Sequence, residues 1–83
     1  MKVFHVKLTS ISDVKQFVSA ACEESFDIDI LTGRYIIDAK SIMGIFSLDL
    51  AKAIRVEAHG AEEEAARFYQ KVKDFAVDAP AEK

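Results

Sequence analysis

Alternating apolar and polar residues predict four β-strands. The alternation occurs in four segments: Lys2 to Leu8, Phe26 to Ile30, Tyr35 to Ala39 and Ala53 to His59. A period of two residues places the apolar side chains on one face of a strand, so we expect a sheet with one buried and one wet face. The second and third segments are joined at Thr32-Gly33, where Gly33 can supply the positive φ that a tight hairpin turn requires.

Apolar residues spaced three to four apart predict three helices. The first follows Ser12 and continues to about Glu24, the second runs from Ser41 to near Asp49, and the third begins near Ala61. Their expected inward residues are Val14, Phe17, Val18, Ala21 and Cys22 in the first helix, and Ala65, Phe68, Tyr69, Val72 and Phe75 in the third. The order β-α-β-β-α-β-α predicts an α+β fold, with one four-stranded antiparallel sheet and the helices on one face.

Length and composition limit the possible functions. The 83 residues suffice for one compact domain, expected over residues 1–77, and the low-complexity segment 78–83 is expected to be a disordered tail. A net charge of −3, with eleven scattered Lys and Arg residues, argues against nucleic acid as the partner. No apolar run reaches the roughly 18 to 20 residues needed to span a bilayer, so the sequence predicts a cytoplasmic protein without a membrane segment.

The few residues suited to metal or redox chemistry are dispersed. The single cysteine, Cys22, cannot form an internal disulfide and is expected to be a small buried thiol. Cys22, His5 and His59 belong to three different predicted elements without ligand spacing, so we expect neither a metal site nor a cofactor. The spacing Ser12-x-x-Lys15 occurs in some hydrolases, but nothing else in this small domain supports an active site. We therefore predict no catalytic residues and no enzyme activity.

The most informative segment is Lys40-Ser41-Ile42-Met43-Gly44, followed by Ile45-Phe46-Ser47-Leu48. It places the Ser41 hydroxyl at the start of a helix that is too short to bury all of its apolar residues. We assign Ile45, Leu48 and part of Met43 to the core, which leaves Ile42 and Phe46 partly exposed. An apolar patch rimmed by Lys40, Lys52 and Asp49 is typical of a protein-binding site. The alternative is that all of these apolar side chains are buried.

The order of elements and the Lys40 to Gly44 motif together resemble the HPr family of the bacterial phosphotransferase system. The resemblance extends from Lys2 to about Phe75 and includes Ser47-Leu48, Ala51-Lys52 and the entry into the last helix from Gly60 to Glu64. It implies an open-faced β-sandwich, in which three helices cover one face of a four-stranded sheet. Asp49, in place of a common family glycine, and a hairpin about two residues shorter indicate a divergent member.

The resemblance also identifies a missing residue. Phosphocarrier members begin the first helix with His-Ala-Arg-Pro, and the matching residues here are Ser12-Asp13-Val14-Lys15. A neutral imidazole is nucleophilic and forms a labile phosphoramidate, whereas a serine hydroxyl needs an activating base and forms a stable ester. Val14 replaces the family arginine, and Asp13 adds a negative charge that would repel a phosphoryl group. We therefore expect no reversible phosphoryl transfer at Ser12.

The two histidines present are poor substitutes for the missing one. His5 is expected to face outward from the middle of a strand, opposite Arg55 or Glu57. His59 precedes the last helix, where backbone N–H groups could hold an anion, but Glu62 to Glu64 would repel phosphate there. If the first and last predicted strands pair antiparallel, His59 also lies at the opposite end of the sheet from Ser12.

The resemblance implies a regulatory role for Ser41. In HPr proteins of many Gram-positive bacteria, and in the histidine-less paralogue Crh, a dedicated kinase phosphorylates the matching serine. The product binds a transcription regulator in carbon catabolite repression. The implied partners are therefore an HPr serine kinase/phosphorylase and a regulator or metabolic enzyme, which would contact Lys40, Ile42, Met43, Phe46 and Lys52. The alternatives are an interaction module that is not phosphorylated and a phosphocarrier; the sequence does not fix the oligomeric state.

Overall fold

The computed structural model describes residues 1–79, in which strands and helices alternate in the order the sequence predicts. The elements are β1 (Lys2–Val6), α1 (Ile11–Cys22), β2 (Ile28–Thr32), β3 (Tyr35–Asp38), α2 (Ile42–Phe46), β4 (Ile54–Ala58), α3 (Glu62–Val72), the 3₁₀ turn η1 (Lys73–Phe75) and β5 (Ala76–Val77). Of the predicted tail, Asp78 and Ala79 are exposed, and residues 80–83 lie outside the described part of the chain. No helix within residues 1–79 is long and apolar enough to cross a membrane.

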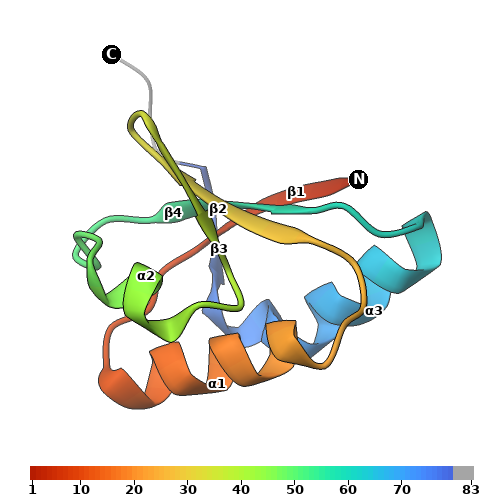
Figure 1. The fold of residues 1–83 in the computed structure, drawn as a ribbon, viewed down its shortest axis with the longest axis horizontal. Helices are drawn as coiled ribbons and strands as arrows, with labels where there is room; N and C mark the ends of the chain where they lie inside the picture. Colours follow the sequence, from red (N-terminus) through yellow and green to blue (C-terminus); the bar gives the residue numbers. More distant parts are fainter. Residues whose placement is uncertain (80–83) are drawn as a thin grey trace.

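The strands form one antiparallel sheet in the order β3-β2-β4-β1-β5. Helices α1 and α3 lie side by side under one face of this sheet, and the short helix α2 lies beside α1 (Figure 1). None of the described helices lies on the opposite face. The prediction of an α+β open-faced β-sandwich is therefore confirmed. At the hairpin between β2 and β3, Gly33 has the expected positive φ of 56°.

The fifth strand is a small correction to the predicted four-stranded sheet. After α3, the turn η1 reverses the chain, so that Ala76 and Val77 pair with Val6 and His5 along the outer edge of β1. The Lys7 amide extends this pairing by donating to the Phe75 carbonyl at 2.9 Å. A strand of two residues is too short to produce a period in the sequence, which is why the pattern did not reveal β5.

The core lies between the sheet and the helices and is organised around the ring of Phe68 on α3. The buried apolar residues are Val6, Leu8, Val14, Phe17, Val18, Ala21, Ile28, Ile30, Ala39, Ile45, Ile54, Val56, Ala58, Ala65, Phe68 and Val72. The rings of Phe4, Phe17 and Phe26 lie 6.3, 6.0 and 6.5 Å from the Phe68 ring, centroid to centroid. Such tilted and edge-on pairs each add about 0.5 to 1.5 kcal/mol beyond the burial of their area. They connect α3 to α1, to β1 and to the segment that leads into β2.

The expectation that Cys22 is a buried thiol is wrong, because the residue is exposed at the end of α1. Its sulfur lies 3.6 Å from the Lys40 carbonyl oxygen. Cys22 is one turn beyond Val18, which lies at the margin of the buried stripe with 9% of its surface exposed. Helical spacing places both residues on the same side of α1 but does not indicate where the covering sheet and helices end.

An ion pair fixes the end of α1 to α3. The Lys71 ammonium lies 2.7 Å from Glu24 Oε2 and 2.9 Å from Glu23 Oε1, and these hydrogen bonds raise the pKa of Lys71. Glu24 is buried, and its backbone carbonyl accepts a 2.8 Å hydrogen bond from Lys40 Nζ. The same residue therefore joins the end of α1 to α3 and to the segment that leads into α2.

A Gly60→Ala substitution should destabilise the protein. A Cβ atom at Gly60 would lie 2.6 to 2.9 Å from ring atoms of Phe26, which is itself packed against Phe68. Inserting a methyl group into such a tightly packed site typically costs about 1 to 3 kcal/mol. Urea unfolding of Gly60→Ala should show a loss in this range.

The partner substitution Phe26→Leu tests the cause of this loss. Removing the ring atoms that meet the new methyl group should make Gly60→Ala less costly in the Phe26→Leu background than in the wild type. Equal losses in both backgrounds would show that the Phe26 ring is not what excludes a side chain at Gly60.

Candidate functional site

The first turn of α1 contains Ser12, the residue at the position of the expected phosphocarrier histidine. The helix begins after Ser10, whose hydroxyl accepts a 3.0 Å hydrogen bond from the Asp13 amide. Ser12 is exposed, and its hydroxyl oxygen accepts a 3.1 Å hydrogen bond from the Gln16 side chain. An amide N–H is a donor and cannot remove the hydroxyl proton, so this contact does not activate Ser12 as a nucleophile.

The carboxylate of Asp13 accepts two hydrogen bonds at the start of α1. Its Oδ2 atom accepts hydrogen bonds from the Thr9 amide and the Thr9 hydroxyl, each 3.0 Å long. The Thr9 amide is the main cause that lowers the pKa of Asp13 below its usual value of 3.8. Asp13 is therefore ionised at neutral pH, and a phosphoryl group at Ser12 would lie beside a fixed negative charge.

Ser41 caps the short helix α2, as the sequence predicts. Its hydroxyl accepts a 3.2 Å hydrogen bond from the Gly44 amide, and its backbone is extended, with φ −104° and ψ 104°. The residue is exposed. The Ser41 hydroxyl is thus held in one place by the cap and is accessible from solvent.

Gly44 allows α2 to approach the sheet closely. A Cβ atom at this position would lie 2.7 Å from the Cγ2 methyl of Ile37 on β3 and 3.3 Å from the Ser41 hydroxyl. The missing side chain therefore brings the helix against the hairpin and leaves the cap undisturbed. The Ser41-Ile42-Met43-Gly44 segment of the motif thus has a packing role in addition to any role in binding.

The exposed apolar residues of α2 differ in part from those expected. Ile45 is fully buried and Phe46 is 40% exposed, as predicted, and Ile42 is half-buried against the core. Met43, which was expected to be partly inward, is 77% exposed, so that expectation is wrong. Met43 is two residues before Ile45 and so lies on the opposite side of α2, which is covered only on the Ile45 side.

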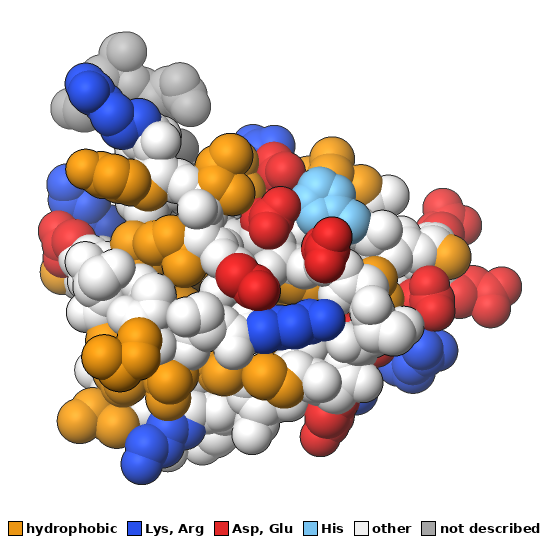
Figure 2. All heavy atoms as spheres, in the orientation of Figure 1, with side chains coloured by type: hydrophobic (Ala, Val, Ile, Leu, Met, Phe, Trp, Pro, Cys, Tyr) orange, Lys and Arg blue, Asp and Glu red, His pale blue; other side chains and the backbone are white. Residues whose placement is uncertain are grey.

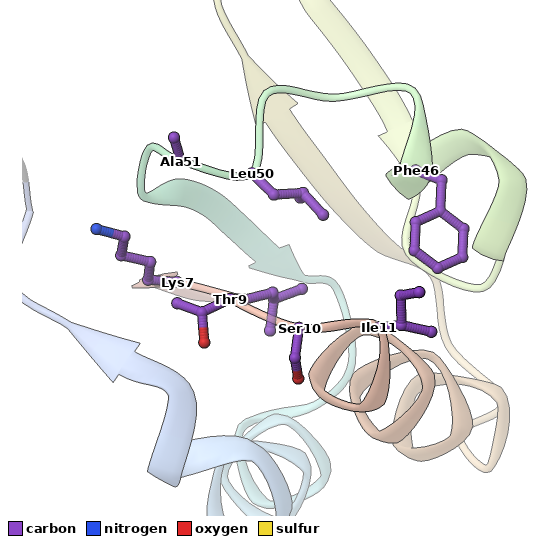
Figure 3. A pocket seen from close by; sticks show the side chains of 8 residues that line it. Lys7, Thr9, Ser10, Ile11, Phe46, Leu50 and Ala51 are labelled. Carbon is purple, nitrogen blue, oxygen red and sulfur yellow. The ribbon is translucent and has the colours of Figure 1, made fainter.

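Two hollows flank the seam between α1 and α2. The first has a volume of about 470 Å³ and lies between Phe46 and Leu50 on one side and the start of α1 on the other (Figure 3). In Figure 3 the Phe46 ring faces Ile11, which is 64% exposed. The second hollow, of about 560 Å³, lies beside Ile42 along the last turns of α1. Ile11 is therefore part of this apolar surface, although the predicted first helix begins only after Ser12.

The predicted rim cations Lys40 and Lys52 occupy different surroundings. The Lys40 ammonium is turned inward to the Glu24 carbonyl, so Lys40 is half-buried. Lys52 is exposed, but it lines a separate hollow on the open face of the sheet with His5 and Arg55. Asp49 uses one carboxylate oxygen to accept a 3.1 Å hydrogen bond from the Ala51 amide. Neither lysine lines the hollow beside Phe46.

The histidines lie where the sequence places them. His5 is paired with Arg55 across the central strands. His59 follows β4, and because Ala58 pairs with Lys2, it lies at the opposite end of β1 from α1. The His59 ring nitrogen Nε2 lies 3.1 Å from the Asp29 carboxylate. Within residues 1–79, no three His, Cys, Asp or Glu side chains gather in a way that could hold a metal ion.

The open-faced β-sandwich with its serine-capped short helix matches a class of small phosphocarrier-like proteins. The family model described as "PTS HPr component phosphorylation site" matches residues 13–78. This match covers most of the chain, so the protein belongs to the HPr family of the phosphotransferase system. The matched residues begin directly after Ser12.

Solved structures of three bacterial HPr proteins share this fold. HPr-C-His from Thermoanaerobacter tengcongensis matches with a TM-score of 0.73 and 25% identity over 89% of each chain. The histidine-containing phosphocarrier protein of Mycoplasma has a TM-score of 0.71 and 20% identity, covering 89% of this chain and 90% of its own. HPr from Bacillus anthracis str. Ames has a TM-score of 0.68 and 24% identity, covering 92% and 96%. None of the curated proteins compared with the sequence matches it.

Removing the Asp13 carboxylate should change how stability depends on pH. The pKa of Asp13 is lowered in the folded state, so its contribution is present above its usual pKa of 3.8 and is lost as pH falls through the lowered value. In urea unfolding from about pH 5 to pH 2, the wild type should lose stability more steeply than Asp13→Asn.

A second variant separates the two Thr9 donors. Thr9→Val removes the hydroxyl donor and keeps the backbone amide, so its pH dependence should fall between those of the wild type and Asp13→Asn. Identical acid profiles for the wild type and Asp13→Asn would contradict the assigned role of this carboxylate.

Proposed function

We propose that this HPr-family protein is regulatory: phosphorylation of Ser41 controls its binding to a partner protein through the surface of α2. In this role it does not relay phosphoryl groups between proteins. The observation that carries the proposal is the exposed Ser41 hydroxyl, which lies at the start of a short helix with two exposed apolar residues, Met43 and Phe46.

The chemistry at the start of α1 supports a function other than phosphoryl transfer. A carrier must accept a phosphoryl group and release it again, which an imidazole does well and an unactivated hydroxyl does poorly. Ser12 has Gln16 as its hydrogen-bond partner, and the neighbouring Asp13 is held ionised. The loss of the nucleophile and the added negative charge both oppose transfer at this position.

The chemistry at Ser41 suits a lasting signal. A serine phosphate is a stable ester with a charge of about −1.5 to −2 at neutral pH, so it persists until an enzyme removes it. Because the hydroxyl is exposed, a kinase can reach it with little disturbance of the core. The phosphate would lie one residue from Ile42, at the edge of the apolar surface, where its charge is available to a bound partner.

The proposed binding surface consists of Ile11, Ile42, Met43 and Phe46, together with the hollow between Phe46 and the start of α1. A partially exposed aromatic ring next to an apolar hollow is a common binding hot spot, because a partner side chain that fills the hollow removes both from water. The proposed partners are an HPr serine kinase/phosphorylase and, after phosphorylation, a transcription regulator or a metabolic enzyme. Lys40 and Lys52 would contribute less than expected, since one faces Glu24 and the other the sheet.

A second candidate is an interaction module that binds through α2 without phosphorylation. It is favoured by the same hollow, which exists without any added charge. The carrier function remains the least favoured, since neither histidine lies at the start of α1.

Two labelling reactions separate these functions. Incubation with labelled ATP and an HPr serine kinase should label the wild type and Ser12→Ala equally. Ser41→Asn should take no label, and because Asn is also a good N-cap it should preserve the fold. Incubation with labelled phosphoenolpyruvate and the general phosphotransfer enzyme should give no label. Label from phosphoenolpyruvate would instead identify a carrier, and absence of label in both reactions would favour the interaction module.

Phe46→Ala should weaken binding of the Ser41-phosphorylated protein to its regulator by about tenfold or more, as measured by calorimetry. Because Phe46 is already 40% exposed, its truncation should cost clearly less than the roughly 3 to 5 kcal/mol of a buried phenylalanine. Val3→Ala, which truncates a residue of β1 that is 39% exposed, serves as the control and should leave this binding unchanged. A large loss of stability with unchanged binding would place Phe46 in the core instead.

A further inference from the structure

One corner of the open sheet face is acidic. Asp38, Asp29 and Glu57 lie directly opposite one another across β3, β2 and β4. Asp27 extends this group, since its carbonyl accepts a hydrogen bond from the His59 amide one step further along the strands. We call Asp27, Asp29, Asp38 and Glu57 the acidic corner. Figure 2 shows acidic side chains gathered around a histidine on the upper part of the molecule.

This row of carboxylates is only partly compensated within the chain. Like charges directly opposite each other on neighbouring strands are destabilising. His59 lies 3.1 Å from Asp29, and Arg55 lies 2.9 Å from Glu57. Asp38 accepts a hydrogen bond from the Lys40 amide, and no ion pair of the described residues involves Asp27 or Asp38. The row would therefore be stabilised by positive charge from outside the molecule.

The adjoining corner of the same face is basic. Lys7, Lys52, Arg55 and His5 line a hollow of about 620 Å³ that opens on this face, together with a single carboxylate, that of Asp78. We call these four residues the basic corner. Neither lysine forms an ion pair with any residue from 1 to 79. The hollow therefore offers cations to a negatively charged partner.

Apolar side chains lie beside the two corners on the same face of the sheet. One row across all five strands contains Ile36, Leu31, Arg55, His5 and Val77, each paired with the next, so three apolar residues share this row with two residues of the basic corner. Ile36 is 70% exposed and Val77 is 42% exposed, and Leu31 lines the basic hollow. The face thus has exposed apolar surface to bury in addition to its charges.

We infer that the partner of this face is a second copy of the same chain. A two-fold axis in the plane of the interface, perpendicular to the line from the acidic to the basic corner, places each acidic corner on the basic corner of the other copy. A two-fold interface must be self-complementary, and a face divided into opposite charges meets this condition. A partner whose surface carries charge of a single sign would match only one of the two corners.

The size of the face indicates a weak dimer. Five strands spaced about 4.8 Å apart, with about 3.3 Å of rise per residue, give a face of roughly 20 by 17 Å. This is smaller than the roughly 800 Å² per partner of a standard interface, so association should depend on concentration. Much of the attraction is between partly exposed charges, so it should also depend strongly on salt.

The test is sedimentation equilibrium of the full chain from micromolar to millimolar concentration. Raising salt from about 0.1 M to 1 M shortens the Debye length from about 10 Å to 3 Å, and the apparent dissociation constant should rise at least about tenfold. The charge-reversed variants Lys7→Glu/Lys52→Glu and Asp27→Lys/Asp29→Lys should each remain monomeric, because each sets like charges against each other in both contacts of the dimer. Circular dichroism melts confirm that the variants are folded.

An equimolar mixture of the two variants is the decisive sample. In the mixed dimer both contacts are again between opposite charges, so association should return to within about threefold of the wild type. A wild type that stays monomeric at low salt would overturn the proposal, and so would a mixture that stays monomeric. Association of each variant alone as tightly as the wild type would show that another surface mediates it.

Discussion

The antiparallel pairing of β1 with β4 near the centre of the sheet decides which functional groups lie together at each end of the sheet. The pairing extends from Lys2 opposite Ala58 to Val6 opposite Ile54. It brings the start of α1 and the segment after α2 to one end of the sheet and sends His59 to the other. A shift of β4 by one residue would turn its buried side chains, Ile54 and Val56 among them, to the open face, so burial of the core fixes this register.

The sequence was sufficient for those features that depend on a repeated local signal. The two-residue period identified four strands, and the positions of Gly33 and Ser41 identified a turn and a helix cap. Features that depend on how far one packed element covers its neighbour were not predictable from the sequence. The exposure of Cys22 and Met43, the contact of Ile11 with the Phe46 hollow and the inward direction of Lys40 all depend on such tertiary boundaries.

Ser12 and Asp13, neighbouring residues at the start of α1, both oppose phosphoryl transfer at this position. Within residues 1–79, the side-chain hydrogen-bond partner of Ser12 is the Gln16 amide, which is not a base, and Asp13 satisfies the Thr9 donors with its own carboxylate. An incoming phosphoryl group would have to displace or approach that charge, which costs energy even with a better nucleophile at position 12. Replacing Ser12 by histidine would therefore restore the nucleophile but not the electrostatic environment. The proposed shift of function toward Ser41 agrees with both changes.

The proposed partner surface and the open sheet face lie on different sides of the molecule, yet Lys7 lines the hollow at each. Its ammonium group is at the end of a flexible stem, so its position responds to charge on either side. Carboxylates of a second copy would draw Lys7 toward the sheet face and away from the rim of the Phe46 hollow. Occupation of one surface should therefore change the binding affinity of the other, and by linkage the two changes in binding free energy have the same magnitude.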